Sequence, residues 1–251
     1  MRILLRLDKH IFVLVLIVLF GPILFLSIVE VHRAIACCTK GTRHVGGSQF
    51  VSDVIGADGY ITYEDGKLCN EGPPPPKAGS HAWVCVVKFF NDNKIWAQTG
   101  WTRYNRAEEV NGSYVLEKRY AEISNGADDI DAVNASMNLT THNYKCQLTD
   151  SADGRWNYYL DNEYWWNFEK NYWINETGNR VQFAGEIWNL EDDMPGINSD
   201  RCVFSALKYY DGSWQNTNLT DDDMWSDDDT KWGVNRVSGT QFEIWDKSPL
   251  P

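Results

Sequence analysis

Short strand-like segments dominate the sequence from Gln49 to the C-terminus. Each is rich in Val, Ile, Tyr, Trp and Thr, and each ends near Gly, Asn or Asp. Residues of these types fit a pleated, half-buried surface, and short strands between turn residues are typical of sandwiches and barrels. The same region has no helical periodicity. The pattern predicts an all-β fold: one antiparallel β-sandwich of the jelly-roll or concanavalin-like kind, with a curved sheet.

The predicted strands follow one another closely. They cover approximately residues 49–55, 60–63, 81–90, 95–104, 114–123, 137–148, 155–160, 164–168, 180–190, 202–210 and 241–245. Residues 91–94 are expected to form a tight hairpin and residues 211–212 another turn. Prolines 73–76 cannot donate to a β-ladder and should lie outside the sheets. The acidic stretch 221–229 is expected to be an exposed loop, and Trp83, Val181 and Phe183 should be buried.

The N-terminus has the pattern of a targeting segment. Arg2, Arg6 and Lys9 precede an uncharged apolar run over residues 11–29, and small residues follow at 34–36. This order predicts a signal peptide over residues 1–36, cleaved after Ala36, and a single β-sandwich domain over residues 37–251. The run is also long enough for a retained membrane anchor, and lipidation of Cys37 is a third interpretation. The protein is therefore expected to be secreted or anchored at the cell surface, with membrane contact only through this segment.

The net charge and the cysteines of the chain limit which partners, disulfides and metal sites are expected. The net charge of −12 argues against nucleic acid, whose phosphates would repel this surface. Six cysteines follow the leader, and in an exported protein they predict disulfides, with at least one among Cys85, Cys146 and Cys202. No cysteine or histidine spacing is typical of a zinc site, so neither a metal nor a cofactor is expected. The aspartates of residues 221–229 offer oxygen ligands for calcium, but a solvated loop is the better interpretation.

Two predicted strands each carry one polar side chain among aromatic residues. Gln98 lies in the segment IWAQTGW, residues 95–101, and Glu186 in FAGEIW, residues 183–188. A carboxylate can activate water as a general base, while an amide donates to the oxygen that becomes negative in a tetrahedral intermediate. If both strand faces line one groove, the pair suits acyl-bond hydrolysis. The substrate-binding candidates that would surround it are Trp96, Trp101, Trp188 and Tyr104. A solvated Gln and Glu on a sheet face is the alternative.

The order of three segments resembles the eqolisins, the glutamic peptidases. These segments are HAWVCV (81–86), WAQTG (96–100) and AGEIWNLEDD (184–193). The resemblance covers approximately residues 80–196. It implies a jelly-roll-like sandwich, a polypeptide substrate, and a catalytic pair formed by Gln98 and Glu186 on the concave face. It also implies that hydrolysis is helped by an acidic medium.

The sequence departs from the eqolisin pattern in three places. The Trp-Tyr-Glu-Trp-Tyr strand of the family is represented only by EKRYAE (117–122). The chain reads CVVKFF (85–90) where the family has a Gly-Ile-Asp-Gly turn, so an aspartate near the active site is absent. Gly185 separates Ala184 from Glu186, where the family joins alanine directly to glutamate. The eqolisin interpretation therefore has a second form, in which the protein is a relative that keeps the cleft but not the peptidase activity.

Aromatic residues favour a different function. The chain has twelve Trp and twelve Tyr, eight of which lie within residues 156–173. Sugar rings stack on exposed aromatic rings, so a non-catalytic carbohydrate-binding domain of the lectin type, with a glycan partner, is the alternative to a peptidase. A glycosidase would need two carboxylates, for which Glu117, Glu122 and Glu186 are candidates. It ranks third because the Glu-x-Asp-x-x-Glu pattern of laminarinase-like sandwiches is missing.

Overall fold

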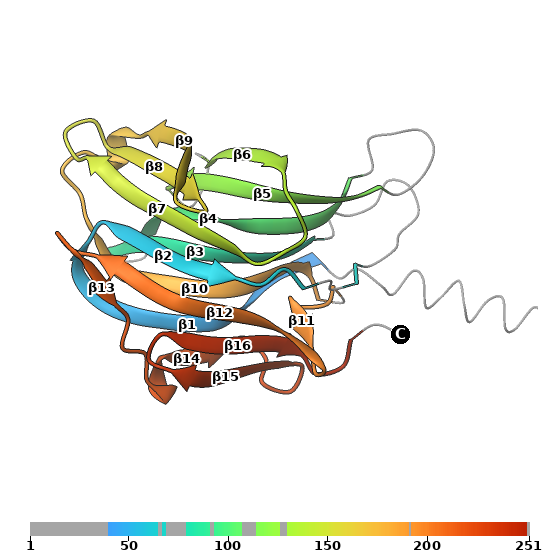
Figure 1. Cartoon of the computed structure of the whole chain (residues 1–251). Helices are drawn as coiled ribbons and strands as arrows, with labels where there is room; N and C mark the ends of the chain where they lie inside the picture. The colour runs from blue at the N-terminus through green and yellow to red at the C-terminus, as the bar shows by residue number, and fades with distance from the viewer. Residues whose placement is uncertain are drawn as a thin grey trace, which may run out of the picture.

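The chain folds into two β-sheets that pack against each other (Figure 1). The computed structural model describes residues 40–64, 67–68, 79–90, 93–106, 114–125, 130–190 and 192–249. Within these ranges the only helical segments are two three-residue 3-10 turns, η1 (Asn171–Trp173) and η2 (Asp221–Asp223). The described part of the chain contains no helix with the length and apolar character needed to cross a membrane. The all-β sandwich prediction is confirmed for these residues, while the predicted leader lies outside them.

The first sheet has seven strands and carries the candidate site. All its neighbouring strands pair antiparallel. Their spatial order is β14 (Met224–Ser226), β1 (Lys40–Val54), β10 (Gly178–Asn189), β3 (Gly79–Phe90), β4 (Asn93–Arg106), β5 (Tyr114–Ser124) and β6 (Ile130–Ser136).

The second sheet has nine strands and covers one face of the first. Its pairs are antiparallel except for a bridge between Ile197 and Asp246. The order is β15 (Trp232–Ser238), β16 (Gln241–Asp246), β11 (Gly196–Ile197), β12 (Asp200–Tyr210), β2 (Gly56–Ile61), β7 (His142–Asp150), β8 (Arg155–Leu160) and β9 (Glu163–Glu169), with β13 (Trp214–Asn216) beside β12.

The main hydrophobic core lies between the sheets. Side chains alternate across a strand, so β10 sends Val181 and Phe183 into the core, and β8 sends Trp156 from the opposite sheet. Burying a side chain of this size contributes about 1.5–3 kcal/mol. The predicted burial of Val181, Phe183 and Trp83 is confirmed, but Trp83 lies on the opposite face of its sheet, in a smaller cluster. Trp156, Tyr158 and Trp173 of the aromatic-rich stretch are also core residues, whereas Trp166 is exposed.

Two predictions of secondary structure were wrong. The strand expected over residues 137–148 begins only at His142, where β7 starts, so residues 137–141 connect β6 to β7 instead of forming a strand. The acidic stretch 221–229 is not wholly a loop. It contains η2 and the short strand β14, whose backbone pairs with β1 at Val45, Gly46 and Gly47. The pairing partner, rather than apolar content, makes β14 a strand. The turn at residues 211–212 is confirmed between β12 and β13, whereas residues 73–76 and 91–92 lie outside the described residues.

The predicted disulfide among Cys85, Cys146 and Cys202 was also wrong. All three are free and buried. Cys85 faces away from the core on β3, whereas Cys146 and Cys202 lie in the core between the sheets. The Cys146 thiol contacts the backbone carbonyl of Ala97 at 3.5 Å, and the Cys202 thiol contacts that of Thr62 at 3.3 Å. Cys37, Cys38 and Cys69 lie outside the described residues.

Candidate active site

A cleft of about 990 Å³ opens on the face of the seven-stranded sheet that is turned away from the core. Strand alternation selects its lining, because every second residue of β1, β10, β3, β4, β5 and β6 faces this side. The cleft combines two carboxylates, Glu122 and Glu186, and three side-chain amides, Gln98, Asn134 and Gln182, with many aromatic rings. The lining side chains that matter here are His44, His81, Trp83, Lys94, Trp96, Gln98, Tyr104, Tyr120, Glu122, Glu186, Trp188 and Trp225.

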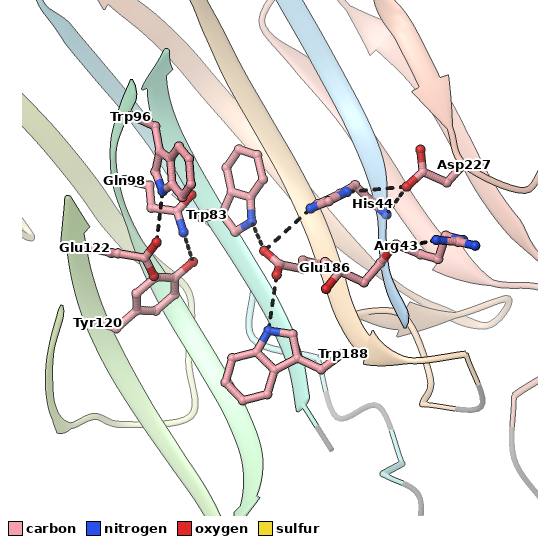
Figure 2. Close-up of polar contacts among 11 residues, drawn as sticks. Arg43, His44, Trp83, Trp96, Gln98, Tyr120, Glu122, Glu186, Trp188 and Asp227 are labelled. Atoms are coloured by element: carbon pink, nitrogen blue, oxygen red, sulfur yellow. Dashed lines mark hydrogen bonds and ion pairs between the residues drawn. The ribbon is translucent and has the colours of Figure 1, made fainter. Parts of the chain in front are cut away.

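Glu186 lies on β10 within this cleft. In the sheet register it stands between His44 of β1 and His81 of β3. Two indole nitrogens hold its carboxylate, as Figure 2 shows. The Nε1 of Trp83 donates to Oε2 at 3.1 Å, and the Nε1 of Trp188 donates to Oε1 at 3.2 Å. Both carboxylate oxygens are therefore oriented by neutral donors.

The environment of Glu186 disfavours its charged form. Burial, together with a smaller contribution from the nearby charge of Glu122, raises the pKa of Glu186 to about 7. The two indole hydrogen bonds and the more distant charge of Lys94 act in the opposite direction without cancelling that effect. A carboxyl with a pKa near neutral can both accept and return a proton at physiological pH.

Gln98 lies on β4 opposite Glu122 of β5. Its amide donates to the Tyr120 hydroxyl at 3.4 Å and also to the Glu122 carboxylate. The Nε1 of Trp96 donates to Oε1 of Glu122 at 2.9 Å. Burial raises the pKa of Glu122, against the effect of these two donors. Burial likewise raises the pKa of Tyr120, so that its hydroxyl keeps its proton and stays a donor.

Gln98 and Glu186 face the same cleft but are not neighbours on the sheet. Strand β3 lies between β4 and β10, and the residue that its register aligns with Gln98 on β10 is Gln182 rather than Glu186. Figure 2 shows the Trp83 ring between the two side chains, and no dashed contact joins them. A substrate therefore has to span the Trp83 ring to meet both groups.

The other predicted substrate-binding residues divide between the two faces. Trp96, Trp188 and Tyr104 line the cleft. The assignment of Trp101 was wrong, because this side chain is fully buried in the core and donates from Nε1 to the carbonyl oxygen of Thr62 at 3.1 Å. Trp101 is three residues from Gln98, and an odd separation places two strand residues on opposite faces. Glu117 does not line the cleft either, so it cannot act with Glu186 there.

His44 and Asp227 belong to the site but were not predicted. The Nε2 of His44 lies 3.8 Å from Oε2 of Glu186, and its Nδ1 lies 3.4 Å from Oδ2 of Asp227. These residues are far apart in the sequence and meet only through the pairing of β1 with β10 and with β14. No sequence motif marks them. The described residues contain no group of three His, Cys, Asp or Glu side chains placed to hold a metal ion.

Solved structures show which fold this is. The structure of scytalido-glutamic peptidase with a peptide-based transition-state analogue aligns with 83% of this chain and 100% of its own, at 14% identity and a TM-score of 0.51. A second structure of that peptidase, with a transition-state analogue inhibitor, gives 12% identity over the same coverage and the same TM-score. The chain has the eqolisin fold. No protein-family profile and no curated protein sequence matches it.

Looser similarities reach other β-sandwiches. The eqolisin SCP-B, solved in a complex with the tripeptide Ala-Ile-His, aligns with 83% of this chain and 100% of its own, at 14% identity and a TM-score of 0.47. A Bacillus licheniformis β-glucanase aligns with 79% of this chain and 69% of its own, at 10% identity and a TM-score of 0.35. Scores this low carry no argument about function. The assignment of an activity rests on the residues of the cleft.

Proposed function

We propose that this protein hydrolyses peptide bonds in the cleft, with Glu186 as the group that activates water. The observation that carries the proposal is the state of Glu186: a partly buried carboxylate with a pKa of about 7, held by two indole donors in the lining of an open cleft. A general base is most effective when its pKa lies near the working pH. The eqolisin fold supports the same reaction class, since the solved relatives are peptidases.

Each polar group of the cleft has a role in this reaction. Glu186 takes a proton from water as the water oxygen attacks the scissile carbonyl carbon. The negative charge that develops on the carbonyl oxygen is stabilised by the Gln98 amide, with the Tyr120 hydroxyl as a second donor. The contact between Gln98 and Tyr120 is long, at 3.4 Å, and a substrate oxygen would replace it. Trp96, Trp188 and Tyr104 hold the chain and exclude bulk water.

The pKa of Glu186 sets the proposed pH range. A group with a pKa of about 7 is mostly protonated in acid and becomes an effective base only as the pH approaches neutrality. We therefore propose that hydrolysis rises between about pH 6 and pH 8, following the ionisation of this carboxyl. An optimum at acid pH, which the eqolisin resemblance implies, requires instead that protonated Glu186 starts the reaction as an acid.

Variants of Glu186 and Gln98 test the reaction. Purified protein is assayed against a denatured protein substrate and fluorogenic peptides from pH 3 to pH 9. Glu186→Gln and Gln98→Ala are each expected to lower kcat/KM by about 100-fold or more while the fold survives. Glu117→Gln is the matched control, because Glu117 lies on the neighbouring part of the sheet but outside the cleft lining, and should leave hydrolysis unchanged.

Two outcomes would overturn the proposal. Unchanged hydrolysis in Glu186→Gln would place the chemistry elsewhere. A wild-type protein that cleaves nothing between pH 3 and pH 9, while soluble glycans quench its tryptophan fluorescence, would favour the carbohydrate-binding alternative.

Glycan hydrolysis is the second candidate, and one observation favours it. Glu122 and Glu186 line one cleft, and the charge of Glu122 raises the pKa of Glu186. Two carboxyls whose environments keep one protonated and one ionised can form the acid–base pair of a glycosidase. Glu122→Gln separates the candidates. It should abolish glycan hydrolysis, but it should only modify peptide hydrolysis, in which Glu122 does not touch the reacting atoms.

A further inference from the structure

His44 stands between two carboxylates at the edge of the cleft. Its backbone N–H donates to Oδ2 of Asp227 at 2.8 Å, and the backbone N–H of Asp227 donates to the carbonyl oxygen of His44 at 3.0 Å. On the other side, the register of β1 and β10 places His44 directly opposite Glu186. The backbone of His44 is therefore fixed from both sides, and Figure 2 shows its imidazole between the Asp227 and Glu186 carboxylates.

The Asp227 carboxylate determines which ring nitrogen carries the proton. A carboxylate oxygen accepts hydrogen bonds, so the 3.4 Å contact between Oδ2 and Nδ1 requires the hydrogen on Nδ1. In a neutral ring, the lone pair then lies on Nε2. This is the nitrogen that faces Oε2 of Glu186 at 3.8 Å, and an approach of about 1 Å would make a hydrogen bond. His44 is thus oriented as a proton acceptor toward Glu186.

The exposure and the protonation states of Glu186, His44 and Asp227 agree with His44 as the proton acceptor. The exposed fraction of the side chain rises from 17% at Glu186 to 29% at His44 and 37% at Asp227. Burial lowers the pKa of His44, against the opposing effect of Asp227, so its ring is neutral and able to accept a proton when Glu186 is ionised. Because the pKa of Glu186 is the higher of the two, the proton rests on Glu186 and its stay on His44 is transient. The charged and titratable groups around His44 are Asp227 beyond β14, Glu186 on β10, His81 on β3, Lys94 on β4 and Arg43 on its own strand.

We infer that Asp227, His44 and Glu186 form a proton-transfer chain, in which His44 takes up the proton that Glu186 removes from the attacking water. This inference rests on the proposed function. As the water oxygen bonds to the carbonyl carbon, one water proton passes to Glu186 and from Oε2 to Nε2 of His44. When the carbon–nitrogen bond breaks, that proton returns through Glu186 to the leaving nitrogen. The imidazolium formed in between lies between two carboxylates, and Asp227 plays the orienting part of a catalytic triad.

Histidine NMR tests the coupling without any substrate. In full-length protein with isotope-labelled histidine, the His44 ring should show Nδ1 protonation and two inflections on titration: its own, and one near pH 7 that reports the ionisation of Glu186. The second inflection should vanish in Glu186→Gln. His142, whose Nδ1 lies 2.7 Å from Asp161 outside the cleft, is the internal control and should lack that inflection. A single His44 inflection in the wild type, or a second one that persists in Glu186→Gln, would overturn the inference.

Steady-state kinetics of His44 and Asp227 variants then test the role of each residue in hydrolysis. His44→Gln should lower kcat about 100-fold with little change in KM, and Asp227→Asn about 10-fold with an altered pH profile. His142→Gln should change neither. A merely structural role would leave the pH profile of Asp227→Asn equal to that of the wild type, and that result would overturn the inference while hydrolysis by Glu186 stands. If the wild-type protein shows both His44 inflections but hydrolyses no substrate, the proposed reaction is overturned. The coupling between His44 and Glu186 then stands by itself.

Discussion

The two faces of the seven-stranded sheet are built by the same strands but differ in what they bury. Toward the second sheet, β3, β4 and β10 present an apolar surface that includes Val84, Trp101 and Phe183. Toward the cleft, the intervening residues of the same strands include Gln98 and Glu186. Burial on the first face stabilises the fold, because it removes apolar area from water. Burial on the second face places a charge-bearing group where the charged form is disfavoured.

A glutamate beside the core shows how a carboxylate is accommodated when it serves the fold. Glu117 on β5 accepts from the Tyr63 hydroxyl at 2.8 Å and lies 3.7 Å from the Arg103 guanidinium. Glu186 has neutral indole donors, and among the described residues no Lys or Arg comes within ion-pair distance of it. The difference shows that Glu186 does not serve the stability of the fold as Glu117 does, because a carboxylate removed from water without a cation shifts its pKa upward instead of stabilising the fold.

The largest expected effect is a difference in stability between substitutions on the core face and on the cleft face of the sheet. Trp101→Ala, on the core face, should lower the free energy of unfolding by about 3–5 kcal/mol, because it opens a large cavity and removes the hydrogen bond to Thr62. Trp96→Ala, two strand positions from Gln98 on the cleft face, should cost less than half as much. Denaturant unfolding of both variants measures the difference. Equal losses would show that the cleft face is packed as a second core.

Strand β4 shows which features of the site can be predicted from the sequence and which cannot. Strand and hairpin signals located β3, β4 and β10, because runs of β-branched and aromatic residues with turn residues between them are local patterns. They also placed Gln98 and Glu186 on strands. The assignment of Trp101 to the cleft failed because it followed the aromatic character of the residue, whereas the two-residue period of the strand assigns it to the other face.

The remainder of the site depends on contacts that no local pattern encodes. His44 and Asp227 are 183 residues apart and meet because β14 pairs with β1. β14 has only three residues in an acidic stretch, and its position follows from the backbone groups that β1 leaves open, not from its composition. The two indole donors to Glu186 likewise come from β3 and from its own strand, and meet its carboxylate once the sheet has formed.

The next effect is a dependence of stability on pH. The pKa of Glu186 is about 7 in the folded protein against 4.5 when exposed, so the folded state holds its proton more tightly. Below pH 4.5 both states are protonated and the carboxyl has no effect. As the pH rises toward 7 the unfolded state loses its proton first, and the fold loses up to about 3 kcal/mol.

Glu186→Gln removes this loss. The variant should be more stable than the wild type by about 3 kcal/mol at pH 8 and nearly equal to it at pH 4, as measured by urea unfolding at both values. Glu117→Gln is the control and should show no gain at pH 8, because Glu117 has the Arg103 guanidinium as a partner. A gain of the same size in both variants would remove the distinction between the two carboxylates.

The smallest effect concerns one hydrogen bond in the cleft. Trp83→Phe keeps an aromatic ring but removes the Nε1 donor to Oε2 of Glu186. That donor favours the ionised carboxylate, so its loss should raise the pKa of Glu186 by up to about one unit, equivalent to about 1.4 kcal/mol. The midpoint of the pH–rate profile and the second inflection of His44 should move upward together. Trp101→Phe, which removes an indole N–H from the core face of β4, should lower stability and leave both midpoints in place. If Trp83→Phe left both midpoints unchanged, the indole would serve only to pack the cleft, and the two faces of the sheet would differ less than their residues indicate.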